Sequence, residues 1–177
     1  MQYPTRRRFL STLAATPLAA SPFMAQAALA PARELRFDNL HTGEKLSVEY
    51  FAAGRYHEDA LTEINRLLRD FRTGDVGEID PSLLDLLHAL RQTTGTREAF
   101  QVISGYRSPA TNAALHRKSN GVATRSLHMQ GKAIDIRLGD VELSSLRKAA
   151  LSLQLGGVGF YPGSNFVHVD TGRVRFW

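Results

Sequence analysis

Residues 126–135 read Ser126-Leu127-His128-Met129-Gln130-Gly131-Lys132-Ala133-Ile134-Asp135 and are the most informative part of the chain. Gly131 lies between His128 and Asp135 and disfavours one continuous helix through both. The two side chains can face each other if the chain turns at Gly131 and enters a strand. Asp135 then lies among apolar residues, where a lone carboxylate is costly unless a cation accompanies it. We therefore predict a turn and then a buried strand over 133–136, with His128 and Asp135 as candidate metal ligands.

A second segment, Phe166-Val167-His168-Val169-Asp170, has the alternation of a strand. His168 and Asp170 should point to one face of that strand and the valines to the other. Two imidazole nitrogens and one carboxylate oxygen, with water in the fourth position, are a typical catalytic zinc set. The chain contains no cysteine, so a transition-metal site must use His and carboxylate ligands. A single His is more often a surface or core residue, and spacing alone leaves that alternative open.

The rest of the chain predicts one α+β domain. Its 177 residues, 43% hydrophobic and 22% charged, are typical of a single globular domain. A hairpin is expected from strands at 34–37 and 46–50. Helices are expected at 58–71, at 81–91 behind the Asp80-Pro81 cap, at 109–116, and after a cap at Asp140. Further strands are expected at 100–103, 157–161, 166–170 and 174–177.

The first part of the chain reads as an export signal. Three arginines at 6–8 precede an alanine-rich stretch, Phe9 to Ala32, that has no charged residue. Arginines followed by phenylalanine and leucine resemble a twin-arginine (Tat) signal. We predict a signal over residues 1–27 and a mature domain over 28–177 that works in the periplasm. Retention as a membrane anchor is the alternative, although the prolines in the stretch make a poor spanning helix.

The net charge of the chain argues against a nucleic-acid partner. The sequence carries 22 basic and 17 acidic residues, a net charge of +5. Without the arginines at 6–8, 19 basic residues remain against 17 acidic ones, which gives +2. That balance is too mild for a polyanion partner, and no helix with clustered Arg or Lys follows the signal. The sequence also lacks a Gly-rich phosphate loop, so we predict neither a nucleic-acid nor a phosphate-transfer role.

Four segments together resemble a known group of peptidases. They are Ser104-Gly105-Tyr106-Arg107-Ser108, the Ser126-x-His128-x6-Asp135 motif, Gly157-Val158-Gly159-Phe160-Tyr161-Pro162 and Phe166-Val167-His168-Val169-Asp170. This set is similar to the LAS group of M15-type zinc peptidases. Within the group it looks most like a branch of periplasmic murein endopeptidases once classed as a domain of unknown function. The similarity extends from about Leu35 to Trp177.

The resemblance implies a fold, a site and an activity. The fold is a small antiparallel sheet with helices packed on one side. By this resemblance, we expect zinc to be bound by His128, Asp135 and His168, and Arg107 to contact the substrate or the developing oxyanion. The resemblance also implies hydrolysis of peptide cross-links in peptidoglycan, with peptidoglycan peptide stems as the partners. The alternatives are a D,D- or L,D-carboxypeptidase acting on muropeptides, or a zinc-stabilised peptidoglycan-binding module without activity.

The chain departs from the wider group just before the last ligand, His168. Many members carry a catalytic Glu three residues, or a His two residues, before that ligand. This sequence has Asn165 and Phe166 there, and neither can act as a base. Asp170 is the nearest carboxylate on the strand face of His168. We expect Asp170 to act either as the general base or as the partner that orients a ligand.

Several other residues near these motifs have a structural interpretation. Phe160, Tyr161 and Phe166 are expected in the core rather than in a substrate platform. Trp177 is expected to pack on the sheet. Arg107 has the alternative role of pairing with a buried carboxylate.

Overall fold

The computed structural model describes residues 31–118 and 123–177. The predicted export signal therefore lies outside the described residues. Within the described ranges, no helix combines the length and the apolar composition needed to cross a membrane. The described elements pack around one hydrophobic core, which joins strands and helices from both halves of the chain.

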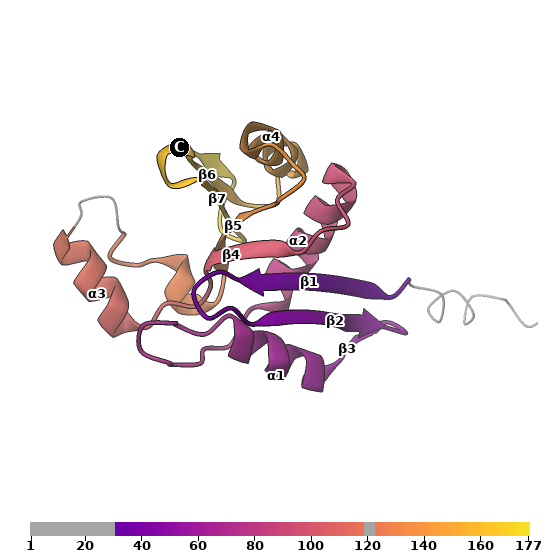
Figure 1. Cartoon of the computed structure of the whole chain (residues 1–177), viewed down its shortest axis with the longest axis horizontal. Helices are drawn as coiled ribbons and strands as arrows, with labels where there is room; N and C mark the ends of the chain where they lie inside the picture. Colours follow the sequence, from indigo (N-terminus) through magenta and orange to yellow (C-terminus); the bar gives the residue numbers. More distant parts are fainter. Residues whose placement is uncertain (1–30, 119–122) are drawn as a thin grey trace, which may run out of the picture.

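One eight-stranded sheet forms the centre of the described chain (Figure 1). Its order is β3 (Arg55–Tyr56), β2 (Lys45–Ala52), β1 (Arg33–Asn39), β4 (Phe100–Ser104), β5 (Ala133–Arg137), β7 (Phe166–Asp170), β6 (Gly157–Tyr161) and β8 (Arg175–Phe176). The β1/β4 and β6/β8 pairs are parallel, and the other pairs are antiparallel. The sheet is therefore mixed, and the predicted antiparallel pairing holds for β4, β5, β7 and β6, which lie together.

Three helices pack on the sheet and contribute residues to the core. α1 (Glu58–Leu67) packs on β2, α2 (Pro81–Thr94) on β1, and α4 (Leu143–Leu153) on β6 and β7. Their apolar residues join those of the strands in a single cluster. α3 (Pro109–Lys118) stands apart from these three helices in Figure 1. This arrangement of a largely antiparallel sheet with packed helices confirms the predicted α+β class.

Capping residues in the sequence determine where α2 begins and ends. Asp80 is the N-cap residue, and its carboxylate accepts a hydrogen bond from the N–H of Ser82 at 2.9 Å. Pro81 follows at the first helical position, where its missing N–H costs nothing. Gly95 ends the helix in the left-handed conformation, with φ 71°. The predicted start of this helix is therefore confirmed.

Two predicted helix boundaries are wrong. Asp140 does not cap α4, whose N-cap residue is Glu142. The Asp140 carboxylate instead accepts hydrogen bonds from the Thr96 hydroxyl, at 2.8 and 2.9 Å to its two oxygens. This contact ties the segment before α4 to the residue that follows the end of α2. α1 is also shorter than predicted and ends at Leu67 rather than near Phe71.

The β5/β7 pair separates the core from the other face of the sheet. The two isoleucines of β5 and the two central valines of β7 are buried in the core. Asp135 and His168 are direct partners in the antiparallel register of the two strands. Because side chains alternate along a strand, Asp135 and His168 lie together on the face opposite those apolar residues.

The turn between His128 and β5 depends on Gly131. A short 3-10 helix, η3 (Leu127–Gln130), ends at Gly131, which has φ 64°. The carbonyl of Gly131 accepts a hydrogen bond from the N–H of Asp80 at 3.1 Å. A Cβ at this position would overlap the carbonyl oxygen of Glu78. Glycine is therefore required both for the backbone conformation and for the close approach of a second segment.

We expect Gly131→Ala to lower the free energy of unfolding by about 3 kcal/mol. The left-handed conformation costs about 1 kcal/mol with a side chain, and the overlap with Glu78 adds an overpacking cost of about 2 kcal/mol. Gly43→Ala is the matched control, because Gly43 has φ 72° but no atom within 4 Å of an added Cβ. Its expected loss is about 1 kcal/mol. Urea unfolding measures both, and equal losses would contradict the role of the close contact.

Candidate metal centre

His128 enters the site from the first turn of η3. The hydroxyl of Ser126 caps this turn and accepts a hydrogen bond from the backbone N–H of His128 at 3.4 Å. Nδ1 of the imidazole lies 2.8 Å from the carbonyl oxygen of Gly105. A carbonyl oxygen only accepts, so Nδ1 carries a proton and donates it. In the neutral ring, Nε2 therefore keeps its lone pair for the site.

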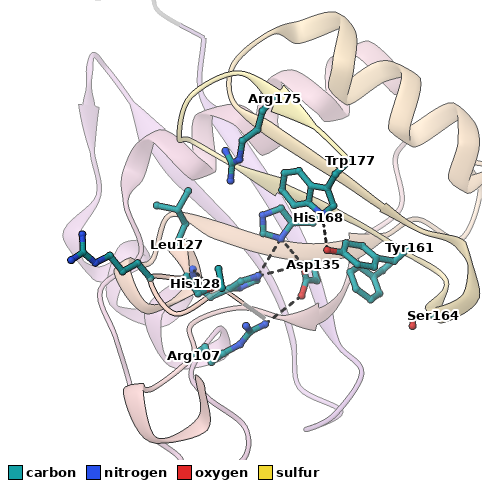
Figure 2. Close-up of a pocket in the computed structure, with 13 residues that line it drawn as sticks. Arg107, Leu127, His128, Asp135, Tyr161, Ser164, His168, Arg175 and Trp177 are labelled. Atoms are coloured by element: carbon teal, nitrogen blue, oxygen red, sulfur yellow. Dashed lines mark hydrogen bonds and ion pairs between the residues drawn. The ribbon is translucent and has the colours of Figure 1, made fainter. Parts of the chain in front are cut away.

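His168 and Asp135 come from neighbouring strands and meet His128 at one point (Figure 2). Nδ1 of His168 lies 2.8 Å from Oδ1 of Asp135 and 3.2 Å from Nε2 of His128. Nε2 of His128 lies 3.4 Å from the same carboxylate oxygen. One ligand atom from each side chain lies within 4.8 Å of the others. The structure thus brings together the three residues that the sequence analysis named as ligands.

The outward hydrogen bonds of the two imidazoles decide which atoms face inward. Nε2 of His168 lies 3.0 Å from Oδ2 of Asp170, where it donates, as Nδ1 of His128 donates to Gly105. With both rings neutral, two nitrogen lone pairs and an Asp135 oxygen point at one another. Such acceptors repel unless a cation lies among them, either a proton or a metal ion. Two imidazole nitrogens, whose rings each have an outward partner, and one carboxylate oxygen fit a metal such as zinc.

The surrounding charges keep Asp135 ionised. Burial raises the pKa of Asp135, but interactions with His128 and His168 outweigh burial and hold the pKa well below its usual range. Burial lowers the pKa of His168, while its hydrogen bonds to Asp135 and Asp170 outweigh burial and raise the pKa above its ordinary value. Cations are therefore favoured at this point of the site, and a proton and a metal ion compete for Nδ1 of His168.

Asp170 is fully buried and surrounded by donors. Its Oδ1 accepts from the N–H groups of Gly157 (3.1 Å) and Gly172 (2.8 Å) and from the Arg175 guanidinium (3.0 Å). Its Oδ2 accepts from Nε2 of His168 (3.0 Å) and from Arg175 (2.7 Å). Burial raises the pKa of Asp170, but hydrogen bonds from His168 and Arg175 outweigh burial and hold the pKa well below its usual range. Every direction around this carboxylate is therefore occupied.

Arg107 lies beside the ligands and is only loosely paired (Figure 2). Its backbone N–H donates to the carbonyl of His128 at 3.2 Å, which fixes the segment against η3. Its Nη2 lies 3.8 Å from Oδ2 of Asp135, and its side chain is 12% exposed. Nε is buried and has no hydrogen-bond partner within the described residues. Burial lowers the pKa of Arg107, but a guanidinium stays charged near neutral pH. Arg107 therefore brings a cation with unused donors to the site.

Asp70 anchors the segment that carries Arg107. Its Oδ2 accepts from the N–H of Ser108 at 2.9 Å and from the Ser108 hydroxyl at 2.8 Å, and its Oδ1 accepts from the N–H of Arg72 at 3.0 Å. The Ser108 hydroxyl in turn accepts from the N–H of Thr111 at 3.2 Å, near the start of α3. No local sequence pattern points to Asp70, because its main partner, Ser108, is remote along the chain.

The candidate ligands line a pocket of about 370 Å³ that opens to solvent. Arg107, Tyr161 and Trp177 also line it (Figure 2), as does Phe166. The rings of Tyr161 and Phe166 stack with centroids 4.6 Å apart, and the indole of Trp177 lies tilted at 5.3 Å from His168. The sequence analysis expected Tyr161 and Phe166 in the core, but both are only half-buried. The alternation of β6 and β7 would have placed both rings on the face of His168.

An α+β fold that presents two imidazoles and a carboxylate to an open pocket fits a metal-dependent hydrolase. A comparison with known families narrows this class. The family described as "Peptidoglycan L,D-endopeptidase MepK" matches residues 27–177. The chain belongs to this family. The resemblance to M15-type murein endopeptidases is therefore confirmed, and so is the predicted enzyme class, a hydrolase that acts on peptide bonds.

Individual relatives agree with this family. The chain is 43% identical over 180 residues to "Peptidoglycan L,D-endopeptidase MepK" of Escherichia coli (strain K12), which covers 99% of both proteins. It is 47% identical over 146 residues to "Probable peptidoglycan L,D-endopeptidase MepK" of Haemophilus influenzae, which covers 82% of this chain and 78% of that protein. Among solved structures, the Serratia marcescens L-Ala D-Glu endopeptidase ChiX matches with a TM-score of 0.37 and 20% identity. The match covers 54% of this chain and 68% of ChiX.

We expect Asp70→Asn to lower the free energy of unfolding by about 2 kcal/mol at neutral pH, because an amide donor would face the N–H and hydroxyl of Ser108. Burial raises the pKa of Asp70, but hydrogen bonds from Thr111 and Ser108 outweigh burial and lower the pKa on folding. The stability from Asp70 is thus present above its unfolded pKa of about 3.9 and is lost as the pH falls through the lower folded pKa.

Urea unfolding of wild type and Asp70→Asn at several pH values checks this expectation. The difference between the two proteins should shrink as the pH falls from neutral to about 3. Asp75→Asn is the matched control, because Asp75 lies in the same loop and is exposed. It should change stability little at either pH. A difference between wild type and Asp70→Asn that does not depend on pH would contradict the role of the ionised carboxylate.

Proposed function

We propose that this protein is a zinc-dependent L,D-endopeptidase that hydrolyses peptide cross-links in peptidoglycan. The observation that carries the proposal is the convergence of His128 Nε2, His168 Nδ1 and Asp135 Oδ1 beside an open pocket. We propose zinc rather than another divalent ion because zinc accepts imidazole and carboxylate ligands in four-coordinate sites. The L,D bond and the peptidoglycan substrate rest on the names of the E. coli and H. influenzae relatives.

The proposed mechanism divides the work between the ion and the chain. When bound, zinc acts as a Lewis acid on a peptide carbonyl and lowers the pKa of water. The chain holds His128 and His168 as neutral ligands through their outward hydrogen bonds to Gly105 and Asp170. Asp135 supplies negative charge to the ligand set. The open pocket leaves room for an extended peptide beside the three proposed ligands.

Arg107 is proposed to bind the carbonyl oxygen of the scissile bond. Its guanidinium lies 3.8 Å from Asp135 and keeps unused donors, so substrate can bind without breaking a close ion pair. A fixed cation stabilises the oxygen more strongly as negative charge develops on it. A guanidinium also clamps a terminal carboxylate, which keeps the carboxypeptidase alternative as one outcome of the test.

Asp170 is proposed to orient His168 rather than to act as the general base. A base needs a free lone pair within reach of the proton that it removes. Both Asp170 oxygens are instead taken up by His168, Arg175 and two backbone N–H groups. A carboxylate behind a metal-ligating imidazole fixes the ring and its tautomer.

The proposed place of action is the periplasm, reached by twin-arginine export of a precursor whose signal is residues 1–27. A peptidoglycan hydrolase has to be exported, because its substrate lies outside the cytoplasm. We expect the mature domain, residues 28–177, in the periplasmic fraction of cells. Changing both Arg6 and Arg7 to Lys should deplete it there, because Tat signals depend on the arginine pair. Unchanged recovery from that fraction would contradict the proposed route.

We expect His168→Ala to lose both zinc and activity. Removing one of three protein ligands should weaken zinc binding by more than about 100-fold, and cleavage of purified sacculi should fall at least as far. His41→Ala is the control, since His41 stacks on Phe71 at 3.7 Å and does not line the pocket. Zinc titration and mass spectrometry of the released muropeptides give the two measurements.

The digestion products also separate the alternatives. An endopeptidase converts cross-linked dimers to monomers, whereas a carboxypeptidase releases one terminal residue. Cleavage of sacculi by wild type should stop with a chelator and return with added zinc. A His168→Ala variant as active as wild type would exclude the proposed site. A zinc-loaded wild type that cleaves no muropeptide would favour the binding module.

We expect Asp170→Asn to weaken zinc binding by about 10–100-fold, because an amide orients the His168 ring less well than a carboxylate. The activity of this variant should recover in part when zinc is added in excess. A general base would give the opposite pattern, with zinc affinity unchanged and activity lost at every zinc concentration. Zinc affinity is measured on protein shown to be folded by circular dichroism, so that misfolding is not scored as lost binding.

A further inference from the structure

Tyr161 lies at the edge of the metal centre on a rigid support. It is the last residue of β6 and pairs with Phe166 on β7, as Gly159 pairs with His168. Side chains of paired residues share a face, so Tyr161 and His168 lie on the same face of the sheet. The Tyr161 ring stacks on Phe166 with centroids 4.6 Å apart and an interplanar angle of 21°. This stacking fixes the ring in the wall of the pocket.

Trp177 fixes the direction of the Tyr161 hydroxyl. The backbone of Trp177 forms two hydrogen bonds with β6. Its N–H donates to the carbonyl of Val158 (3.2 Å), and its carbonyl accepts from the N–H of Phe160 (3.1 Å). The indole covers Gly159, where a Cβ would lie 2.8 Å from the ring. From this position Nε1 donates to the Tyr161 hydroxyl at 2.7 Å. An indole N–H only donates, so the phenol oxygen is the acceptor in this bond.

The phenol proton is therefore left to donate elsewhere. A hydroxyl has one donor and two acceptor positions, and Trp177 uses an acceptor position. Among the residues that the structure describes, none accepts a hydrogen bond from the Tyr161 hydroxyl. Figure 2 shows the phenol oxygen on the side of the ring that faces His168 and Asp135, and the pocket is lined by all three residues together with Arg107. The hydroxyl therefore lies in the same pocket as the candidate metal ligands, with its proton available to a bound substrate.

We propose that Tyr161 is a further catalytic residue, which donates a hydrogen bond to the carbonyl oxygen of the scissile peptide as that oxygen gains negative charge. The inference rests on the peptidase function proposed above. Arg107 and Tyr161 then act as two donors to one oxygen, one charged and one neutral. The proton stays on the phenol and no bond to Tyr161 forms or breaks. Trp177 is a positioning residue, since it acts through the hydroxyl that it orients.

The Tyr161→Phe variant tests the inference, because it removes the hydroxyl and keeps a ring to stack on Phe166. On a cross-linked muropeptide dimer, kcat should fall about 100-fold, the effect of removing one oxyanion donor. KM should change less than about 2-fold, and zinc affinity should equal that of wild type, because the hydroxyl acts on the transition state and touches no ligand.

A binding measurement tests the same point without catalysis. The probe is a dimer analogue in which a tetrahedral, anionic phosphinate replaces the scissile amide. Its Kd for the zinc-loaded protein should rise in Tyr161→Phe by about the factor lost in kcat, whereas the Kd of the cleaved peptide should not change. A ring that serves only as a packing surface would weaken both ligands equally.

Trp177→Phe supplies the matched control for orientation. This change keeps an aromatic ring on Gly159 but removes the N–H that holds the hydroxyl. We expect kcat to fall about 10-fold in the wild-type background and not to fall further in Tyr161→Phe, because the two residues act through one hydrogen bond. Wild-type kcat in Tyr161→Phe, a loss confined to KM, or weakened zinc binding would overturn the inference and leave the peptidase function standing. A zinc-loaded wild type without activity would overturn both.

Discussion

The register of β5 against β7 is the constraint on which the rest of the site depends. It sets Asp135 directly opposite His168, and Ile134 opposite Val169. A slip of one residue would turn the imidazole into the core and a valine into the pocket. Burial of each large aliphatic side chain is worth roughly 2 kcal/mol, so the apolar face holds this register firmly. Asp135 and His168, two of the proposed metal ligands, are thus positioned by apolar residues on the opposite face of the sheet.

The third proposed ligand, His128, is held in a different way, because it does not come from the sheet. Its 3-10 turn ends at Gly131, which lies against the backbone of Glu78 and joins the turn to β5. The imidazole is then held from behind by the carbonyl of Gly105. A strand fixes a side chain through its pleat, whereas an isolated turn must fix its side chain through hydrogen bonds and close packing. That difference explains why η3 is tied to two other segments of the chain.

The sequence predicted this site where the pattern is local and failed where the contacts are remote. Alternation along a single strand was enough to place His168 and Asp170 on one face. The choice between base and orienting partner for Asp170 could not be made, because it depends on Arg175, whose reach back to Asp170 requires β8 to lie parallel to β6. The position of Trp177 over Gly159 has the same origin. Asp140 was misassigned because a capping residue and a partner for Thr96 look alike in sequence.

The glycines of β6 now have a physical explanation within the site. From Gly157 to Phe160, β6 alternates glycines on the site face with larger residues on the core face, and Tyr161 then follows on the site face. β6 lies next to β7, which carries His168. A Cβ at Gly157 would overlap the ion pair of Asp170 and Arg175, and one at Gly159 would press on the indole of Trp177. One strand therefore supplies the imidazole, and its neighbour supplies the empty space in which the groups around that imidazole lie. The glycine motif of β6 and the His168 motif of β7 therefore depend on each other, because the side chains around His168 occupy the volume that the glycines leave.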